Sequence, residues 1–264
     1  MENFAYHRPA QLADAVNQMK KAADGKFMSG GMTLIATMKQ GLATPSDIID
    51  LGALKNSGVS VSGSNVTIKA GTTHADVSTD KSLEQAIPAL SKLSGGIGDP
   101  HVRNRGTIGG SVSNNDPAAD YPSALLGLGA TVHTNERKIP ADQFFTDMFT
   151  TALGENEIVT AIEFPVPKKA GYAKFPNPAS RYAIVGVFVA QLADGSVRVA
   201  VTGAGPKVFR VAEMEKALTQ NFTADAIARI TVPAKGLNGD IHASPEYRAH
   251  LVGVMAKRAI AAAK

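Results

Sequence analysis

The apolar residues near the start of the chain recur at helical spacing. Between residues 9 and 21, Leu12, Val16 and Met19 fall on one face of a helix, and a glycine follows the segment. The next runs are β-like at 26–28, helix-like at 34–40 and β-like at 47–51. This order predicts a small βαβ-like lobe over residues 1–55.

Alternation of apolar and polar residues begins after Asn56. Residues 59–61 alternate, residues 66–70 do so again, and a polar turn separates them, which predicts a β-hairpin. Further on, the pattern predicts a helix with gaps over 75–93, a short helix over 122–128, and strands over 130–134 and 157–164. Helices and strands mixed in this order indicate a second lobe over 56–167, with a mixed or antiparallel sheet.

Two prolines and a lysine pair at 165–169 interrupt both periodicities and mark a boundary. Beyond it, strands are predicted at 172–175, 181–192 and 197–202, with Asp194-Gly195 as the turn before the last, and helices at 211–219, 223–230 and 244–263. Ser244 is suited to cap the final helix and Pro245 to occupy its first position. Strands followed by helices beyond this boundary indicate a separate α+β unit.

Composition excludes several function classes. The formal charge of the 264-residue chain is +4, but its Lys and Arg residues are dispersed, so we expect no nucleic-acid partner. The chain has no cysteine, so a thiolate zinc site or a cysteine-ligated iron–sulfur cluster must belong to another chain. The six histidines lack ligand spacing, and we expect no metal site.

The chain shows neither a basic-then-apolar leader nor an apolar run long enough to cross a bilayer. We therefore expect a cytoplasmic protein without a membrane span.

The candidate chemistry lies in two glycine-paired bends. The first, Ser29-Gly30-Gly31-Met32-Thr33, precedes a predicted helix, where unpaired N–H groups favour an anion. The second, Thr107-Ile108-Gly109-Gly110-Ser111, lets the backbone approach a bulky ligand and adds two hydroxyls. Asn115 and Asp120 follow, and Asp120 is suited to accept hydrogen bonds from a sugar or ring hydroxyl. One Gly-Gly pair alone favours an ordinary turn, but two such bends suggest a diphosphate held from two sides.

Both bends resemble the FAD-binding medium subunit of the molybdenum hydroxylases, the family of carbon monoxide dehydrogenase flavoprotein, xanthine dehydrogenase and aldehyde oxidoreductases. The matching segments run in family order: S-G-G-M-T-L-I-A-T-M-K-Q-G-L-A-T-P-S-D-I-I-D-L at 29–51, H-V-R-N-R-G-T-I-G-G-S-V-S-N-N-D-P-A-A-D-Y-P at 101–122, S-R-Y-A-I-V-G-V at 180–187 and P-E-Y-R-A-H-L at 245–251. The resemblance implies an α+β fold, with a two-lobed FAD-binding domain of the vanillyl-alcohol-oxidase (PCMH) type (1–55 and 56–167). It also implies a small α+β C-terminal domain (168–264) with a three-stranded sheet and helices.

The same resemblance implies an electron-transfer function. A molybdopterin large subunit would hydroxylate the substrate, and a small subunit with 2Fe-2S clusters would relay electrons to FAD in this chain. An external acceptor, which would be NAD, a quinone or oxygen, would then take them. The implied assembly is a dimer of heterotrimers, and no catalytic residue is expected in this chain because the flavin carries the redox chemistry.

Several residues receive their roles through the resemblance. Lys174 occupies the place of a lysine near the flavin, where a positive charge favours the reduced ring, or it is a solvated strand lysine. Tyr182 would shield the flavin ring or simply begin a buried strand, and Ile97 would contact the flavin or belong to the core. The predicted cofactor-binding set is Ser29, Gly30, Gly31, Met32, Thr33, Leu34, Ile97, Thr107, Ile108, Gly109, Gly110, Ser111, Asn115, Asp120, Lys174 and Tyr182.

Some features depart from this picture or leave alternatives. Met32 stands where several relatives carry a polar residue, and Ala36 where many carry proline. His101 and Arg103 flank the second bend, either assisting the phosphates or lying at the surface. The Gly203-Ala-Gly-Pro segment lacks the third glycine of a Rossmann site, and we reject it as one. Two other functions remain open: a stand-alone FAD-dependent reductase on the same fold, and a flavin-free scaffold subunit.

Overall fold

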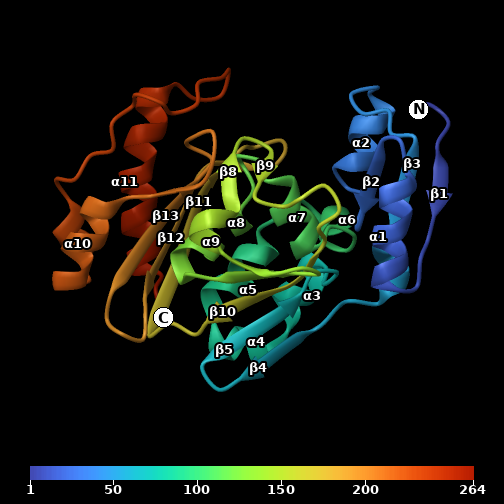
Figure 1. The fold of residues 1–264 in the computed structure, drawn as a ribbon. Coiled ribbons are helices and arrows are strands. Elements are labelled where there is room, and N and C mark those ends of the chain that lie inside the picture. The colour runs from blue at the N-terminus through green and yellow to red at the C-terminus, as the bar shows by residue number, and fades with distance from the viewer.

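The computed structural model describes all 264 residues, and Figure 1 shows three units, each built on its own sheet, in chain order from right to left. The N-terminal unit has a parallel three-stranded sheet in the order β1-β3-β2. Its elements are β1 (Ala5–His7), α1 (Leu12–Lys21), β2 (Gly25–Met28), α2 (Leu34–Lys39), β3 (Asp47–Asp50) and the 3-10 helix η1 (Leu51–Leu54). The expected βαβ-like arrangement is confirmed.

The middle unit has an antiparallel five-stranded sheet in the order β4-β5-β10-β6-β7. Its strands are β4 (Val59–Ser62), β5 (Asn65–Lys69), β6 (Thr131–Thr134), β7 (Lys138–Pro140) and β10 (Val159–Pro165), with a separate pair β8 (Phe145–Asp147) and β9 (Thr150–Thr151). Its helices are α3 (His74–Thr79), α4 (Lys81–Ala86), α5 (Pro88–Gly95), α6 (Pro100–Arg103), α7 (Ile108–Asn114), α8 (Tyr121–Leu128) and α9 (Ala141–Phe144). The expected hairpin is confirmed as β4 and β5.

The predicted gapped helix over 75–93 consists of the three helices α3, α4 and α5. Asp80 ends the first and caps the second, since its carboxylate accepts the N–H of Leu83 at 2.9 Å. Pro88, which has no N–H to continue a helix, begins the third.

The C-terminal unit has four strands in the order β11-β12-β13-β14, so the expected three-stranded sheet was wrong. The elements are β11 (Lys169–Pro176), β12 (Ala183–Gln191), β13 (Val197–Thr202), β14 (Phe209–Arg210), α10 (Ala212–Gln220), η2 (Ala224–Ile227) and α11 (Pro245–Ala261). β14 is only two residues long, too short to show alternation. The helix expected over 223–230 is instead the single 3-10 turn η2. Ser244 caps α11 as expected, accepting the N–H of Tyr247 at 3.2 Å.

The C-terminal sheet is buried on both faces. Alternate residues of a strand point to opposite faces, so Phe188 and Ala190 of β12 join the core of the middle unit, whereas Val187 and Val189 pack under α10 and α11. Figure 1 shows these helices on the outer face of the sheet and α8 on the inner face. This packing makes the middle and C-terminal units one continuous body.

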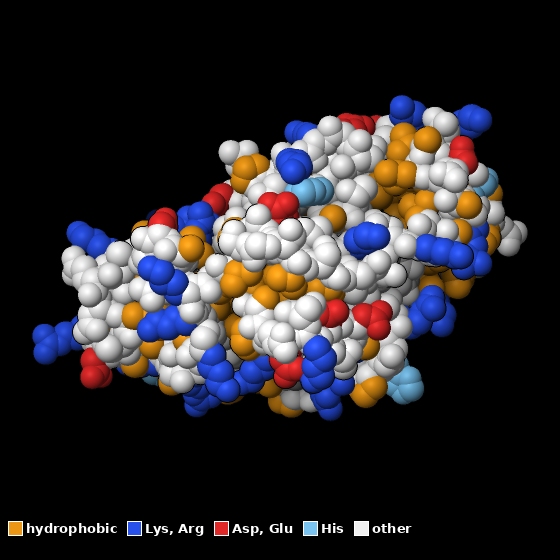
Figure 2. All heavy atoms as spheres, turned by 90° about the horizontal axis from the view of Figure 1, so that it is seen from below, with side chains coloured by type: hydrophobic (Ala, Val, Ile, Leu, Met, Phe, Trp, Pro, Cys, Tyr) orange, Lys and Arg blue, Asp and Glu red, His pale blue; other side chains and the backbone are white.

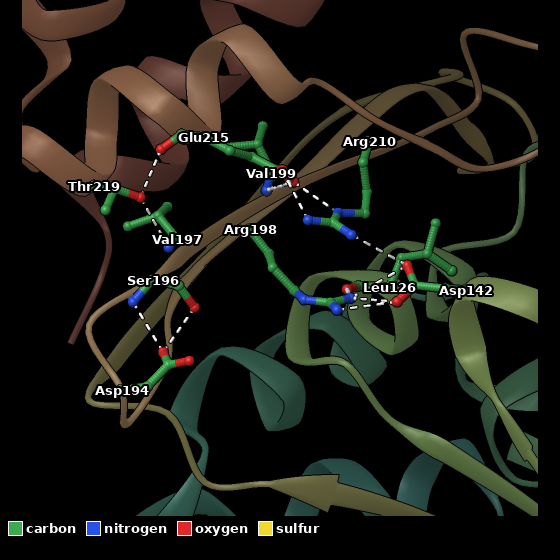
Figure 3. A network of polar contacts seen from close by, with 10 residues as sticks. All are labelled: Leu126, Asp142, Asp194, Ser196, Val197, Arg198, Val199, Arg210, Glu215 and Thr219. Carbon is green, nitrogen blue, oxygen red and sulfur yellow. Dashed lines mark hydrogen bonds and ion pairs between the residues drawn. The ribbon is translucent and has the colours of Figure 1, made fainter.

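A network of ion pairs reinforces that junction (Figure 3). Arg198 on β13 donates to the Leu126 carbonyl and to Asp142, at 2.9 Å each. Arg210 reaches the same carboxylate at 3.4 Å and pairs with Glu215 at 2.8 Å. The network therefore ties the C-terminal sheet to α8 and α9 of the middle unit.

The Lys and Arg residues that are dispersed along the sequence are also dispersed on the visible surface. On the face shown in Figure 2, Lys and Arg side chains are scattered among acidic and apolar ones. None of the helices combines the length and the apolar character that crossing a lipid bilayer requires.

Candidate functional site

The two glycine-paired bends meet in space. Ser29 follows β2 directly, and Thr107 immediately precedes α7. Their hydroxyl oxygens lie 2.9 Å apart, although 78 positions separate the residues in the chain. The Thr107 hydroxyl also accepts the N–H of Gly110 at 3.1 Å. The second bend is therefore the capped first turn of helix α7.

The contact between the bends requires glycine at position 30. A Cβ atom built on Gly30 would lie 1.9 Å from the carbonyl oxygen of Arg105, a distance that no side chain tolerates. Gly31 has a φ of +74°, in the left-handed region that L-residues rarely adopt. The glycine pair thus allows two backbone segments from different units to touch.

A large cleft opens beside this contact. Its volume is about 1290 Å³, above the roughly 300–1,000 Å³ of pockets for single small molecules. All three units line it, with residues that include 25–34, 51–52, 54–57, 97–98, 104–107, 109–111 and 180–182. An elongated dinucleotide is therefore within its capacity.

The two bends differ in the backbone donors that they offer. None of the N–H groups from Ser29 to Thr33 donates to another protein group. In the second bend, by contrast, the N–H groups of Ile108 and Gly109 donate to the Thr72 and Ala70 carbonyls, at 3.0 and 2.9 Å. The N–H groups without a protein acceptor therefore lie mostly in the first bend, since in the second bend only the Thr107 N–H has none, although the sequence had suggested that the second bend also turns its N–H groups toward the ligand.

A buried polar cluster forms the inner end of the cleft. Asp120 is 3 % exposed, its Oδ1 lies 3.0 Å from Nζ of Lys174, and it accepts a hydrogen bond from the Tyr172 hydroxyl. Burial raises the pKa of Asp120, and the Lys174 charge opposes that rise. Lys174 also donates to the Gly96 carbonyl at 2.8 Å, and its side chain is 10 % exposed. The alternative of a solvated strand lysine was therefore wrong.

The structure brings most of the predicted cofactor-binding residues to the cleft wall. Ile97 and Tyr182 both line it, and Tyr182 is 44 % exposed just before β12. Three predicted residues lie outside the lining: Ile108, Asn115 and Lys174. Ile108 is fully buried in the core, and the Asn115 amide donates to the carbonyls of Asp147 and Thr150, at 2.8 Å each.

Sequence reasoning missed two features of the cleft wall. His74, at the start of α3, lines the cleft although it is only 4 % exposed; burial, with a contribution from the Arg103 charge, lowers its pKa to about 4. Arg103 is half-buried and does not line the cleft; its Nη1 donates to the carbonyls of Ile97 and Gly98, at 3.0 and 3.1 Å. His74 packs against the ring of Tyr121 on α8, a contact between distant segments that no local pattern indicates. Arg103 bonds to the loop just before its own helix, which leaves no periodic trace in the sequence.

Comparison with known proteins accounts for nearly the whole chain. Residues 2–167 match the family described as FAD binding domain in molybdopterin dehydrogenase, and residues 170–263 match the CO dehydrogenase flavoprotein C-terminal domain. The nicotine 6-hydroxylase medium subunit of Paenarthrobacter nicotinovorans is 33 % identical over 97 % of this chain and 95 % of its own length. The carbon monoxide dehydrogenase medium chain of Afipia carboxidovorans is 34 % identical over 99 % and 97 %.

Solved structures show the same fold. A chain of the reconstituted CO dehydrogenase from Oligotropha carboxidovorans superposes with a TM-score of 0.90 at 30 % identity, covering 99 % of this chain and 97 % of that one. A chain of carbon monoxide dehydrogenase from Hydrogenophaga pseudoflava gives a TM-score of 0.87 at 29 % identity, with the same coverage.

Proposed function

This chain belongs to the family of FAD-binding medium subunits of the molybdenum hydroxylases, and from that membership we propose that it carries electrons from an iron–sulfur partner subunit to an external acceptor. The observation that supports a working cofactor site is the meeting of the two bends, with Ser29 and Thr107 hydroxyls 2.9 Å apart beside the cleft. When bound, FAD supplies storage for two electrons between one-electron donors and the acceptor.

The residues of the cleft fit a dinucleotide. The N–H groups of Ser29 to Thr33 are free, and a row of such donors suits a diphosphate. Because Gly30 has no Cβ, its backbone can lie against the Arg105 carbonyl, and no side chain separates the two bends. The first bend, with the Thr107 and Ser111 hydroxyls and the glycines between them, would hold the diphosphate.

The remaining predicted residues would contact the ring and sugar portions of FAD. Ile97 and Tyr182 are suited to contact the ring, because both present apolar surface at the cleft wall. Asp120 would accept a hydrogen bond from the cofactor. Lys174 does not line the cleft. It would therefore act on the cofactor indirectly, through the Asp120 carboxylate with which its amino group is paired. Residues 1–55 and 56–167 would form the FAD-binding lobes, and 168–264 the C-terminal domain.

The partners follow from the relatives. They bear the names medium subunit and medium chain, which imply larger and smaller companions in their complexes. We infer a small iron–sulfur subunit with 2Fe-2S clusters and a large molybdopterin subunit here as well, arranged as a dimer of heterotrimers in the cytoplasm. NAD, a quinone or oxygen would be the acceptor.

The test is FAD binding by the purified full chain, followed by electron transfer in the co-purified complex. The wild-type chain should bind FAD, and substrate should reduce that FAD only when the partner subunits are present. A chain that takes up no FAD with or without its partners would instead be a scaffold subunit. Substrate turnover by the chain alone would indicate a stand-alone reductase.

A further inference from the structure

The segment Gly96–Gly98 is held by cationic side chains along its whole length. It links α5 to α6 and lines the cleft through Ile97 and Gly98. Lys174 donates to the Gly96 carbonyl at 2.8 Å, and Arg103 donates to the carbonyls of both following residues, at 3.0 and 3.1 Å. Arg181 adds a longer contact of 3.4 Å to the Gly98 carbonyl. Every carbonyl in this segment therefore faces a positive charge.

These cations reach the segment from two units. Arg103 ends α6 in the middle unit, Lys174 lies on β11, and Arg181 precedes β12 in the C-terminal unit. Arg181 has a φ of +62°, a conformation that costs a residue with a side chain on the order of 1 kcal/mol or more and that clusters at functional sites. The segment is thus fixed in position by both units that meet at this end of the cleft.

The charges at the segment are only partly balanced, since the Asp99 carboxylate that follows it is influenced by the Arg181 charge. Lys174 is paired with Asp120, but no carboxylate lies within 4.0 Å of the guanidinium of Arg103 or Arg181. Arg103 is half-buried and donates only to uncharged carbonyls, so its charge has no counter-ion in the protein. A half-buried cation without a counter-ion strengthens the binding of negative charge nearby.

We propose that Arg103 is a positioning residue that holds the Ile97 segment against the bound cofactor and that its uncompensated charge favours the reduced, more negatively charged state of FAD. Arg181 supports the same segment from the C-terminal unit. This inference rests on the proposed FAD function. It assigns the tuning of the cofactor to a residue that does not itself line the cleft, acting through the carbonyls of Ile97 and Gly98.

The experiment compares FAD binding in both redox states by the full chain. Oxidised and reduced FAD are each titrated into wild type, Arg103→Met and Arg103→Lys, and the potential of the bound FAD is measured. Arg103→Met should weaken the binding of reduced FAD about tenfold relative to oxidised FAD, a negative shift of about 30 mV for a two-electron couple. Arg103→Lys keeps the charge and should leave the ratio of the affinities for reduced and oxidised FAD within about twofold of the wild-type ratio.

Arg229→Met is the matched control, because it removes the same charge at an exposed position outside the cleft lining. It should leave the ratio of the two affinities unchanged.

A purely structural role for Arg103 would weaken the binding of oxidised and reduced FAD equally, and an unchanged ratio of the two affinities in Arg103→Met overturns the inference. If that variant does not fold, Arg103→Gln takes its place, because it also removes the charge: a selective loss of reduced FAD supports the inference, and an unchanged ratio of the two affinities overturns it. Wild-type chain that binds no FAD at all overturns the proposed function and this inference with it.

Discussion

The amino group of Lys174 lies 3.0 Å from a carboxylate oxygen of Asp120, across the junction between the middle and C-terminal units. The side chains are 10 % and 3 % exposed, so water screens this pair little. Breaking a buried pair leaves the remaining charge without a partner, and that penalty commonly exceeds the net value of the pair itself.

Asp120→Asn should therefore destabilise the chain by about 3 to 5 kcal/mol in urea-induced unfolding. The double variant with Lys174→Met should recover part of this loss, because neither charge then stays buried. Glu84→Gln, which breaks the exposed Lys81–Glu84 pair, serves as the control and should cost less than about 1 kcal/mol. Additive losses in the double variant would mean that the two side chains are not coupled.

Gly30→Ala should separate the two bends. The new methyl group would lie 1.9 Å from the Arg105 carbonyl oxygen, which is backbone and cannot turn aside. We expect FAD affinity to fall at least tenfold, measured by titration. Gly253→Ala on α11 is the matched control, because its methyl group would meet no atom within 4 Å; it should leave affinity intact and add up to about 1 kcal/mol of stability. Equal FAD affinity in the two variants would show that the close approach is not needed.

The hydroxyl contact between Ser29 and Thr107 should be measurable separately from the helix cap. Ser29→Ala removes only the 2.9 Å contact and should cost about 1 kcal/mol of unfolding free energy. Thr107→Ala also removes the cap on Gly110 and should cost about 1 to 2 kcal/mol more. Thr107→Ser, which keeps the hydroxyl, should recover most of that loss. If Thr107→Ser is as unstable as Thr107→Ala, the methyl group rather than the oxygen is responsible.

Stability should decline in acid through Glu157. Its carboxylate accepts two hydrogen bonds from Arg137 at 3.0 Å, which chiefly lower its pKa from 4.5 to about 2, and further bonds from Gly154 and Thr134. A lowered carboxyl pKa stabilises the fold above pH 4.5, and the contribution disappears as the pH falls toward 2. The contribution is at most about 3 kcal/mol, because the Arg137 side chain is 54 % exposed and water screens part of its interaction with the carboxylate.

Urea unfolding of wild type and Glu157→Gln across this range tests that expectation. The variant should be less stable at neutral pH, and the difference between the two proteins should shrink toward pH 2. A difference that stays constant with pH would assign the effect of the substitution to packing instead of ionisation.

Residue patterns alone predicted the three sheet-based units. Periodicity and turn residues act over a few neighbours, so the βαβ-like start, the β4–β5 hairpin and the cap of α11 at Ser244 were accessible from short segments. The glycine bends were also visible, because Gly-Gly with hydroxyls is a local composition. The two-residue strand β14 escaped detection, since its pairing with β13 leaves no periodic trace.

The partners of individual side chains came from tertiary structure. The pairing of Asp120 with Lys174 joins residues 54 positions apart, and the N–H groups of Ile108 and Gly109 find acceptors more than 30 positions away. Arg103 bonds to carbonyls only five and six positions before it, but this turn of its side chain leaves no periodic pattern in the sequence. Local preference decides which element a segment forms, because it involves neighbouring residues only. Which donors stay free for a ligand is decided when those elements pack together and their backbone groups find partners.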